Sequence, residues 1–204
     1  MEKFEVRFKE SLGRISEVLE NVKQLLNFSE KDIEILKVRK DLLKSWSNEI
    51  IEDFYANLLK SEKAREIIEK NNIDLNKLKE ANKRWYEQIA SGNVDEKFFR
   101  YSFYVGLLHI YYDVDNHLMI LMADVLKRKF LKLCLETFDE EEAFEVYQSF
   151  SKVVSAFVGI TVEGYIFMLK EALLDILGMK PELVNRLLKM ELEQAVQHFR
   201  KKLV

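Results

Sequence analysis

Residues 103–115 read FYVGLLHIYYDVD, an apolar and aromatic run that holds one of only three histidines in the chain. On a helix, Val105 would lie about one turn before His109 and Asp113 about one turn after it. A histidine in such surroundings is either a core residue with satisfied hydrogen bonds or a ligand. The apolar neighbours of His109 suit a flat hydrophobic cofactor held by one axial imidazole.

The composition of the whole chain predicts a single all-α domain. The chain has 204 residues, of which 48% are hydrophobic and 33% are charged, as in a soluble globular protein with one core. It contains one proline and six glycines, so few positions interrupt a helix. We therefore expect helices joined by short loops.

Composition and pattern also disfavour several classes of function. The net charge of −3 gives no basic surface for nucleic acid. A single cysteine, Cys134, and a charged N-terminus without a signal peptide indicate the cytoplasm. The apolar segment 153–169 is shorter than the roughly 20 residues that span a bilayer and contains Glu163, so we expect a core helix and no membrane. We find no nucleophile–base pair or phosphate loop, which argues against an enzyme.

Capping residues divide the chain into about eight helices. Ser29, followed by Asp32, has the pattern of a capping box, and Asp74 and Asp95 are N-caps of later helices. Gly92 and Gly178 are placed to end helices, and Pro181 suits a first helical position. The expected helices span about 2–26, 30–59 (either straight or with a bend), 62–70, 75–91, 96–112, 117–138, 140–177 and 181–204.

A small metal site is the rival interpretation of His109. His109, Asp113 and His117 are spaced i, i+4, i+8, which would place them on one face of an unbroken helix. The residues DVDN at 113–116 read as a helix end, however, and no HExxH or Glu-x-x-His pattern is present. Zinc and di-iron sites are therefore disfavoured.

Three stretches, in order, resemble a known family. They are IIEDFYANLLKSEKAREII (50–68), LKEANKRWYEQIASGNVDEKFF (78–99) and VGLLHIYYDV (105–114). From about residue 29 to 175 the chain resembles the sensor globins, the haem domains of bacterial globin-coupled sensors, and their protoglobin relatives. The resemblance implies a globin-like fold over residues 1–177, with an extra N-terminal helix at about 2–26. Residues 178–204 would add a C-terminal amphipathic helix for packing, dimerisation or signalling.

The resemblance also implies a binding site for haem b. His109 matches the proximal iron ligand, and its other ring N–H would be held by a carbonyl one turn back, such as that of Val105. Tyr55 matches the distal tyrosine, whose hydroxyl donates a hydrogen bond to dioxygen in the pocket. Phe54, Leu78 and Val105 match positions that line the haem faces. The alternative for Tyr55 is a core tyrosine with its hydroxyl at the surface.

The distal helix departs from the family pattern. Ala81 stands where many relatives have a threonine and cannot donate a hydrogen bond. Asn82 lies one turn after Leu78, so it either replaces this donor or is solvated. Trp85, one turn further along, is expected to line the same pocket. After His109 the chain also lacks the usual arginine and proline-containing turn, and Leu118 and Met119 replace an aromatic pair.

The last two helices of the family form an intermolecular four-helix bundle, so the resemblance implies a homodimer. Segments 117–138 and 140–177 are rich in large apolar residues, although a central helix within one subunit would also explain them. The expected function is sensing of O2 or another diatomic gas. Because 178–204 contains no transmitter motif, we expect the chain either to act through a separate downstream signalling partner or to be the sensory part of a longer protein. The alternatives are a haem-free helical interaction module and, less favoured, a globin that handles O2 or NO chemically. The residues that suggest the dimer are Phe138, Phe144, Val146, Tyr147, Phe150, Val153, Val154, Phe157, Ile160, Tyr165, Ile166, Phe167 and Met168.

Overall fold

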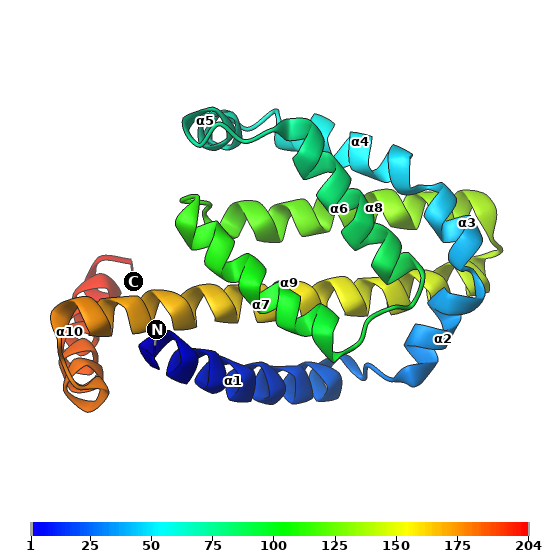
Figure 1. The fold of residues 1–204 in the computed structure, drawn as a ribbon. Helices are drawn as coiled ribbons and strands as arrows, with labels where there is room; N and C mark the ends of the chain where they lie inside the picture. Colours follow the sequence, from blue (N-terminus) through cyan, green and yellow to red (C-terminus); the bar gives the residue numbers. More distant parts are fainter. Residues whose placement is uncertain (1, 204) are drawn as a thin grey trace. The chain divides into compact units, whose positions relative to one another are not determined.

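The computed structural model describes the backbone of residues 2–203 and the side chains of residue 6 and residues 9–202. Within these residues the protein is all helical, as predicted, and contains no strand (Figure 1). Contacts divide the chain into unit 1, Met1–Tyr165, and unit 2, Ile166–Val204. The helices are α1 (Glu2–Leu26), α2 (Glu30–Val38), α3 (Lys40–Ser45), α4 (Ser47–Leu58), α5 (Glu62–Lys70), α6 (Leu75–Ala90), α7 (Glu96–Tyr111), α8 (Asn116–Thr137), α9 (Glu140–Leu177) and α10 (Pro181–Leu203).

The predicted caps set several of the helix ends. The Asp32 carboxylate accepts the backbone N–H of Ser29 at 2.9 Å, which closes the capping box of α2. Asp74 accepts the N–H groups of Asn76 and Lys77 at the start of α6, at 3.0 and 3.2 Å. Gly92 ends α6 with φ +66°, and a Cβ there would meet the carbonyl oxygen of Ile33 at 2.8 Å. Only glycine fits this turn without displacing α2.

The segment expected over 30–59 as one helix, either straight or with a bend, is three helices, and a residue at each break makes a tertiary contact. At the first break, the Arg39 side chain reaches Glu142 of α9, with its Nε 2.8 Å from the carboxylate. At the second, the ring of Trp46 meets the edges of Phe130 and Phe138. The partners of both residues lie 84 residues or more further along the chain, so local sequence did not reveal where the breaks fall.

The core of unit 1 lies where α3, α4, α6, α8 and α9 meet. Phe130 of α8 stacks on Phe150 of α9 with ring centroids 3.7 Å apart. The Tyr86 hydroxyl donates to the Leu43 carbonyl at 2.7 Å, which satisfies a fully buried polar group. Cys134 is also buried here, and burial raises the pKa of its thiol to about 12. The single cysteine therefore lies in the core as an unreactive thiol.

The predicted additional N-terminal helix, α1, packs on α7. Ile15 and Leu19 from its apolar stripe are buried. Arg14 of α1 pairs with Glu163 of α9, its Nε 2.7 Å from the carboxylate. The side chains of Phe4 and Phe8, which belong to the same predicted stripe, lie outside the described residues.

Helix α9 is long and apolar enough to cross a membrane by length and composition alone. Val153, Val154 and Ile160 from its apolar segment are fully buried within unit 1. This is the environment of a core helix, which the sequence predicted for 153–169. Much of the apolar character of α9 is therefore explained within one subunit.

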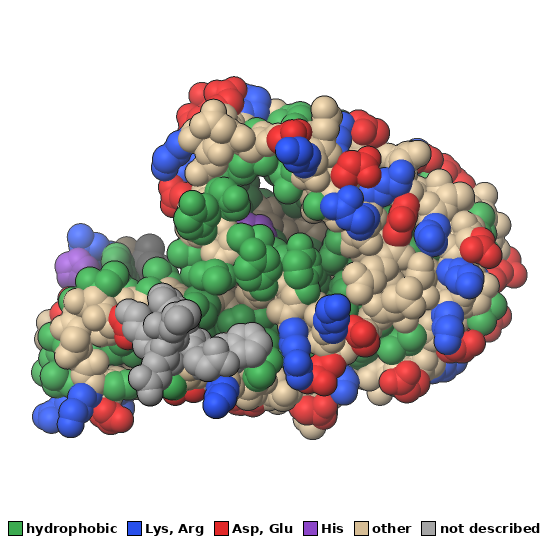
Figure 2. Space-filling model, in the orientation of Figure 1, with side chains coloured by type: hydrophobic (Ala, Val, Ile, Leu, Met, Phe, Trp, Pro, Cys, Tyr) green, Lys and Arg blue, Asp and Glu red, His purple; other side chains and the backbone are tan. Residues whose placement is uncertain are grey.

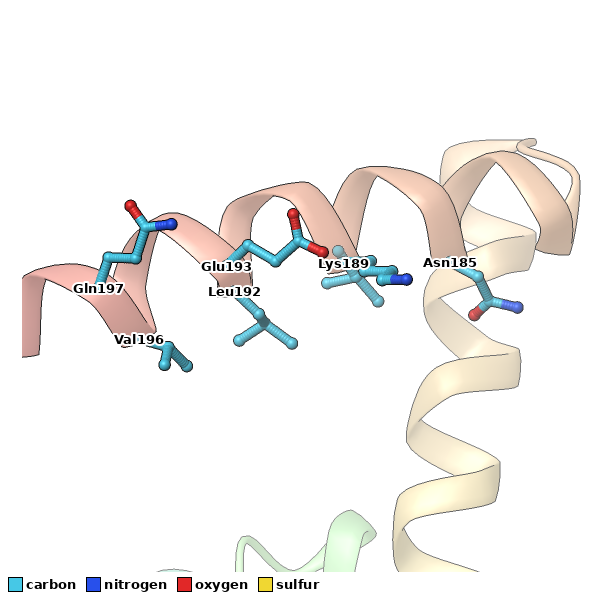
Figure 3. Close-up of a pocket in the computed structure, with 7 residues that line it drawn as sticks. Asn185, Lys189, Leu192, Glu193, Val196 and Gln197 are labelled. Carbon is cyan, nitrogen blue, oxygen red and sulfur yellow. The ribbon is translucent and has the colours of Figure 1, made fainter. Parts of the chain in front are cut away.

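Unit 2 comprises the last turns of α9 and the whole of α10. Figure 3 shows that α10 is amphipathic, because Leu192 and Val196 point to one side and Glu193 and Gln197 to the other. The apolar side chains of α10 are about half exposed; they include Leu183, Leu187, Leu188, Leu192, Val196 and Phe199. The amphipathic helix was predicted, and its role as an extension stays a prediction.

Helices α7 and α9 cross with their backbones in contact (Figure 1). A Cβ added to Gly106 would lie 2.7 Å from the backbone nitrogen of Tyr165, and one added to Gly164 would lie 2.7 Å from the Phe103 carbonyl oxygen. The Thr161 hydroxyl donates to the Ser102 carbonyl at 2.9 Å in the same crossing. The crossing is closed to any larger residue and holds α7, with His109, against α9.

Gly106→Ala should lower the free energy of unfolding by about 1–3 kcal/mol, because the added methyl group meets backbone that side-chain rotation cannot move. Gly13→Ala is the matched control, since Gly13 is also helical and nothing lies within 4 Å of its Cβ position. The control should raise stability by about 1 kcal/mol through helix propensity. Chemical denaturation measures both variants, and equal effects would contradict the close crossing.

Candidate functional site

His109 lies in the last turn of α7 and is held by the backbone of its own helix. Its Nδ1 is 2.8 Å from the carbonyl oxygen of Val105, one turn earlier. A carbonyl can only accept, so Nδ1 carries the proton and the neutral ring keeps its lone pair on Nε2. No described residue bonds Nε2. A core histidine would have both nitrogens satisfied, and this one offers a free ligand atom.

Burial favours the neutral form of this imidazole. Desolvation lowers the pKa of His109 below its ordinary 6.5, against the opposing effect of the hydrogen bond with Val105. His109 is half-buried, whereas His117 and His198 are exposed. Of the three histidines, His109 alone combines a sheltered ring with a defined tautomer.

The chain turns away directly after His109. Helix α7 ends at Tyr111, Asp113 has φ +59°, and the Val114 N–H donates to the His109 carbonyl at 2.8 Å. His117 belongs to α8, so the i, i+4, i+8 set does not continue along one helix face. Among the described residues, no three His, Cys, Asp or Glu side chains gather as a metal site.

Figure 2 shows a hollow on this face of unit 1, below α5 and α6 and above α7 in the orientation of Figure 1. Hydrophobic side chains form most of its rim, and a histidine side chain lies inside it. Charged side chains gather elsewhere on the same face. An apolar hollow with few polar groups has the character of a cofactor site.

Tyr55, on α4, is 1% exposed, and its ring contacts Phe54 at a centroid distance of 5.3 Å. Its hydroxyl oxygen accepts a hydrogen bond from the Asn82 side-chain amide of α6 at 2.8 Å. Burial raises the pKa of Tyr55 well above its ordinary 10. The hydroxyl therefore stays protonated and can act as a donor. It does not reach the surface, as a core tyrosine with a solvated hydroxyl would.

Four expected pocket residues share one face of α6. Leu78, Ala81, Asn82 and Trp85 are spaced i, i+3, i+4, i+7, and all are half-buried. Trp85 packs against Phe157 of α9 with centroids 4.9 Å apart, and its indole nitrogen is buried with no hydrogen-bond partner. Asn82 is bonded to Tyr55, so it is not merely solvated. An unpaired buried donor such as Trp85 is uncommon, and it is consistent with a site that a bound group completes.

The sequence interpretation did not assign two residues to this site: it placed Phe157 in the dimer interface and gave Gly164 no role. Phe157 backs the Trp85 ring from α9, and Gly164 allows α9 to touch α7. An aromatic residue and a glycine within a long apolar helix give no local signal of either role. The role of Gly164 becomes visible only in the structure, where its backbone lies against α7 beside Gly106.

The sequence model of the protoglobin family matches residues 16–171. The chain belongs to the protoglobin family. The matched range begins within α1, earlier than the resemblance from about residue 29 suggested, and it stops before α10. No curated protein sequence matches this protoglobin.

Two solved structures share the fold of this protoglobin. One is the globin domain of a globin-coupled sensor from Geobacter sulfurreducens, with a TM-score of 0.65 and 21% identity over 72% of this chain and 96% of that domain. The other is the globin domain of Escherichia coli DosC in a ferric form, with a TM-score of 0.55 and 15% identity over 72% of this chain and 99% of that one. At these identities the likeness establishes the fold, and it confirms the predicted globin-like architecture.

Proposed function

We propose that this protoglobin is a haem-binding gas sensor in which His109 is the single protein ligand of the iron. The observation that carries the proposal is the His109 imidazole, with Nδ1 tied to the Val105 carbonyl and Nε2 left free. Membership of the family implies haem binding, and haem b is the cofactor we propose. Bound there, haem would supply an iron that can take up O2, CO or NO.

The residues of the chain fit such a group. Phe54, Leu78, Ala81 and Val105 provide half-buried apolar surface for a flat ring and exclude water from it. The Val105 carbonyl orients the His109 ring and makes it a better electron donor. Trp85 offers a buried indole N–H that has no acceptor among the residues that the structure describes. On the other side of the pocket, we propose that the Tyr55 hydroxyl donates to the gas ligand.

A sensor must also pass on the signal that a gas has bound. We propose that this protein does so as a homodimer. Part of the predicted interface is internal, because Val146, Phe150 and Val153 are buried in unit 1. Other large apolar residues on α8 and α9 remain exposed: Ile120, Leu121, Leu135, Phe144, Ile166, Leu169, Leu173 and Ile176. We propose that these side chains meet a second copy and that gas binding shifts the helix packing between two states.

The C-terminal helix, the cellular location and the partners of the protein also belong to the proposal. Residues 178–204, with the exposed apolar face of α10, are proposed as an extension that helps the dimer or contacts a downstream signalling partner. We propose a cytoplasmic protein that acts by binding, with no nucleic-acid or membrane partner. The exposed end of α9 and the helix α10 are the parts of the chain best suited to carry the signal onward.

Haem added to the purified protein should bind one to one and give a histidine-ligated absorption spectrum. His109→Ala should lose or alter this spectrum, and free imidazole should restore it by occupying the vacated position. His117→Ala is the control, because His117 is exposed and lies on α8. A parent spectrum in His109→Ala would remove His109 as the ligand. Absence of stoichiometric uptake by the parent would favour the haem-free interaction module.

Tyr55→Phe should raise the O2 dissociation rate about 10- to 100-fold, because a hydrogen bond to a partly charged acceptor contributes about 1.5–3 kcal/mol. CO carries little charge when bound, so its dissociation rate should change much less. Stopped-flow exchange of the two gases measures both rates. An unchanged O2 rate would mean that the Tyr55 hydroxyl does not contact the ligand.

The protein should have the mass of a dimer in light scattering, and Phe144→Arg should shift it toward the monomer. Phe144 is 60% exposed, so the substitution places a charge at the proposed interface without filling the core. Leu25→Arg is the control, since Leu25 is 84% exposed on α1. A monomeric parent would contradict the dimer. A dimer unaffected by Phe144→Arg would place the interface away from this residue.

A further inference from the structure

We infer that Asn82 is a positioning residue, which sets the direction of the Tyr55 hydroxyl proton and does not itself donate to the gas ligand. The inference rests on the proposed function and concerns the residue next to Ala81, the position at which this chain departs from the usual distal pattern. It explains how a pocket with Ala81 in place of a donor keeps a directed hydrogen bond.

The contact that carries the inference joins two helices. The Asn82 amide nitrogen on α6 lies 2.8 Å from the Tyr55 hydroxyl oxygen on α4, and these helices pack together. Tyr55 is almost fully buried and Asn82 is half-buried, so water competes little for this bond. A hydrogen bond sheltered from water is stronger and better oriented than one at the surface.

The hydroxyl of tyrosine can donate one hydrogen bond through its proton and can accept hydrogen bonds through the lone pairs of its oxygen. In Tyr55 the Asn82 N–H occupies the acceptor side, and among the described residues no group accepts the Tyr55 proton. Conjugation keeps a phenol proton near the plane of its ring, on one side of the oxygen or the other. Because the amide N–H repels a proton on its own side, the Tyr55 proton turns to the opposite side.

The amide has a second effect, on donor strength. Donation from Asn82 to the oxygen polarises the O–H bond, since hydrogen bonds in a chain strengthen one another. Phe54 packs against the Tyr55 ring, and the Lys79 ammonium lies 5.6 Å from its centroid. The ring is thus confined on several sides, and the amide determines the remaining freedom, the rotation of the hydroxyl.

A role through Tyr55 and a direct role of Asn82 differ in one measurable respect. If Asn82 acts through Tyr55, its removal matters only while the hydroxyl is present. If Asn82 donates to the ligand itself, its removal matters equally in Tyr55→Phe. A reversed amide, whose oxygen would accept the Tyr55 proton, predicts the opposite sign, because removing Asn82 would then free the donor.

The test is a double-mutant cycle with Asn82→Leu, Tyr55→Phe and the double variant in the haem-loaded protein. Leucine keeps the branched shape of asparagine without its hydrogen bonds. Asn82→Leu should raise the O2 dissociation rate about three- to tenfold, the effect of one neutral hydrogen bond. In the Tyr55→Phe background it should add less than about twofold. Asn76→Leu, an exposed residue on the same helix, is the control and should change nothing.

The C–O stretching frequency of the CO complex supplies a readout that is independent of rates. It should rise in Asn82→Leu toward the value for Tyr55→Phe, because both variants weaken donation to CO. In the haem-free protein, Asn82→Leu should raise the equilibrium constant for unfolding about fivefold. The same change should be near neutral in Tyr55→Phe, since the bond has already lost one partner.

The outcomes separate the inference from the proposed function. Additive effects of the two substitutions on O2 release would show that Asn82 acts on the ligand directly and would overturn the positioning role. A slower O2 release in Asn82→Leu would also overturn it, in favour of the reversed amide. Both results leave haem binding intact. Absence of haem uptake by the parent protein, in contrast, contradicts the proposed function itself.

Discussion

The close crossing of α7 and α9 is the constraint on which the site depends. Gly106 and Gly164 let two helix backbones touch, and the Thr161–Ser102 hydrogen bond closes the same contact. His109 lies only three residues beyond Gly106, so the contact limits where its ring can lie. A side chain at either glycine would separate the two helices and so shift His109 together with α7.

The two sides of the candidate pocket are held by different means. On the α7 side, a backbone carbonyl orients His109, and burial keeps its imidazole neutral. On the α4–α6 side, one side chain orients another, because the Asn82 amide bonds to the Tyr55 hydroxyl. A hydrogen bond to a main-chain carbonyl persists when the side chain of that residue is substituted. A hydrogen bond from a side chain is lost when that one residue is substituted.

Helix α9 links the site to the remainder of the chain. Its first part is buried against α8 and contacts α7, and it runs without interruption from unit 1 into unit 2. In the proposed sensor, a displacement of α7 would act first on α9, because the glycine contact leaves no compressible side chain between them. The exposed apolar residues of α9 and α10 provide surface on which such a change could be read by a partner.

The sequence by itself determined the helices, most of their ends and the candidate ligand. Caps such as Asp74 and Asp95, and stops such as Gly92, act within one turn of the chain, so local pattern was sufficient to find them. Tyr55 and His109 were singled out because the sequence around each resembles a family pattern, and their roles stay proposals. These features depend on neighbours in sequence.

Only the tertiary structure decided the breaks at Arg39 and Trp46, the partner of Asn82 and the contact between Gly106 and Gly164. Each depends on a group that is distant in sequence, and the 3.6-residue period of a helix carries no information about it. Periodicity shows which face of a helix is buried. The crossing of the helices determines which residues that face meets.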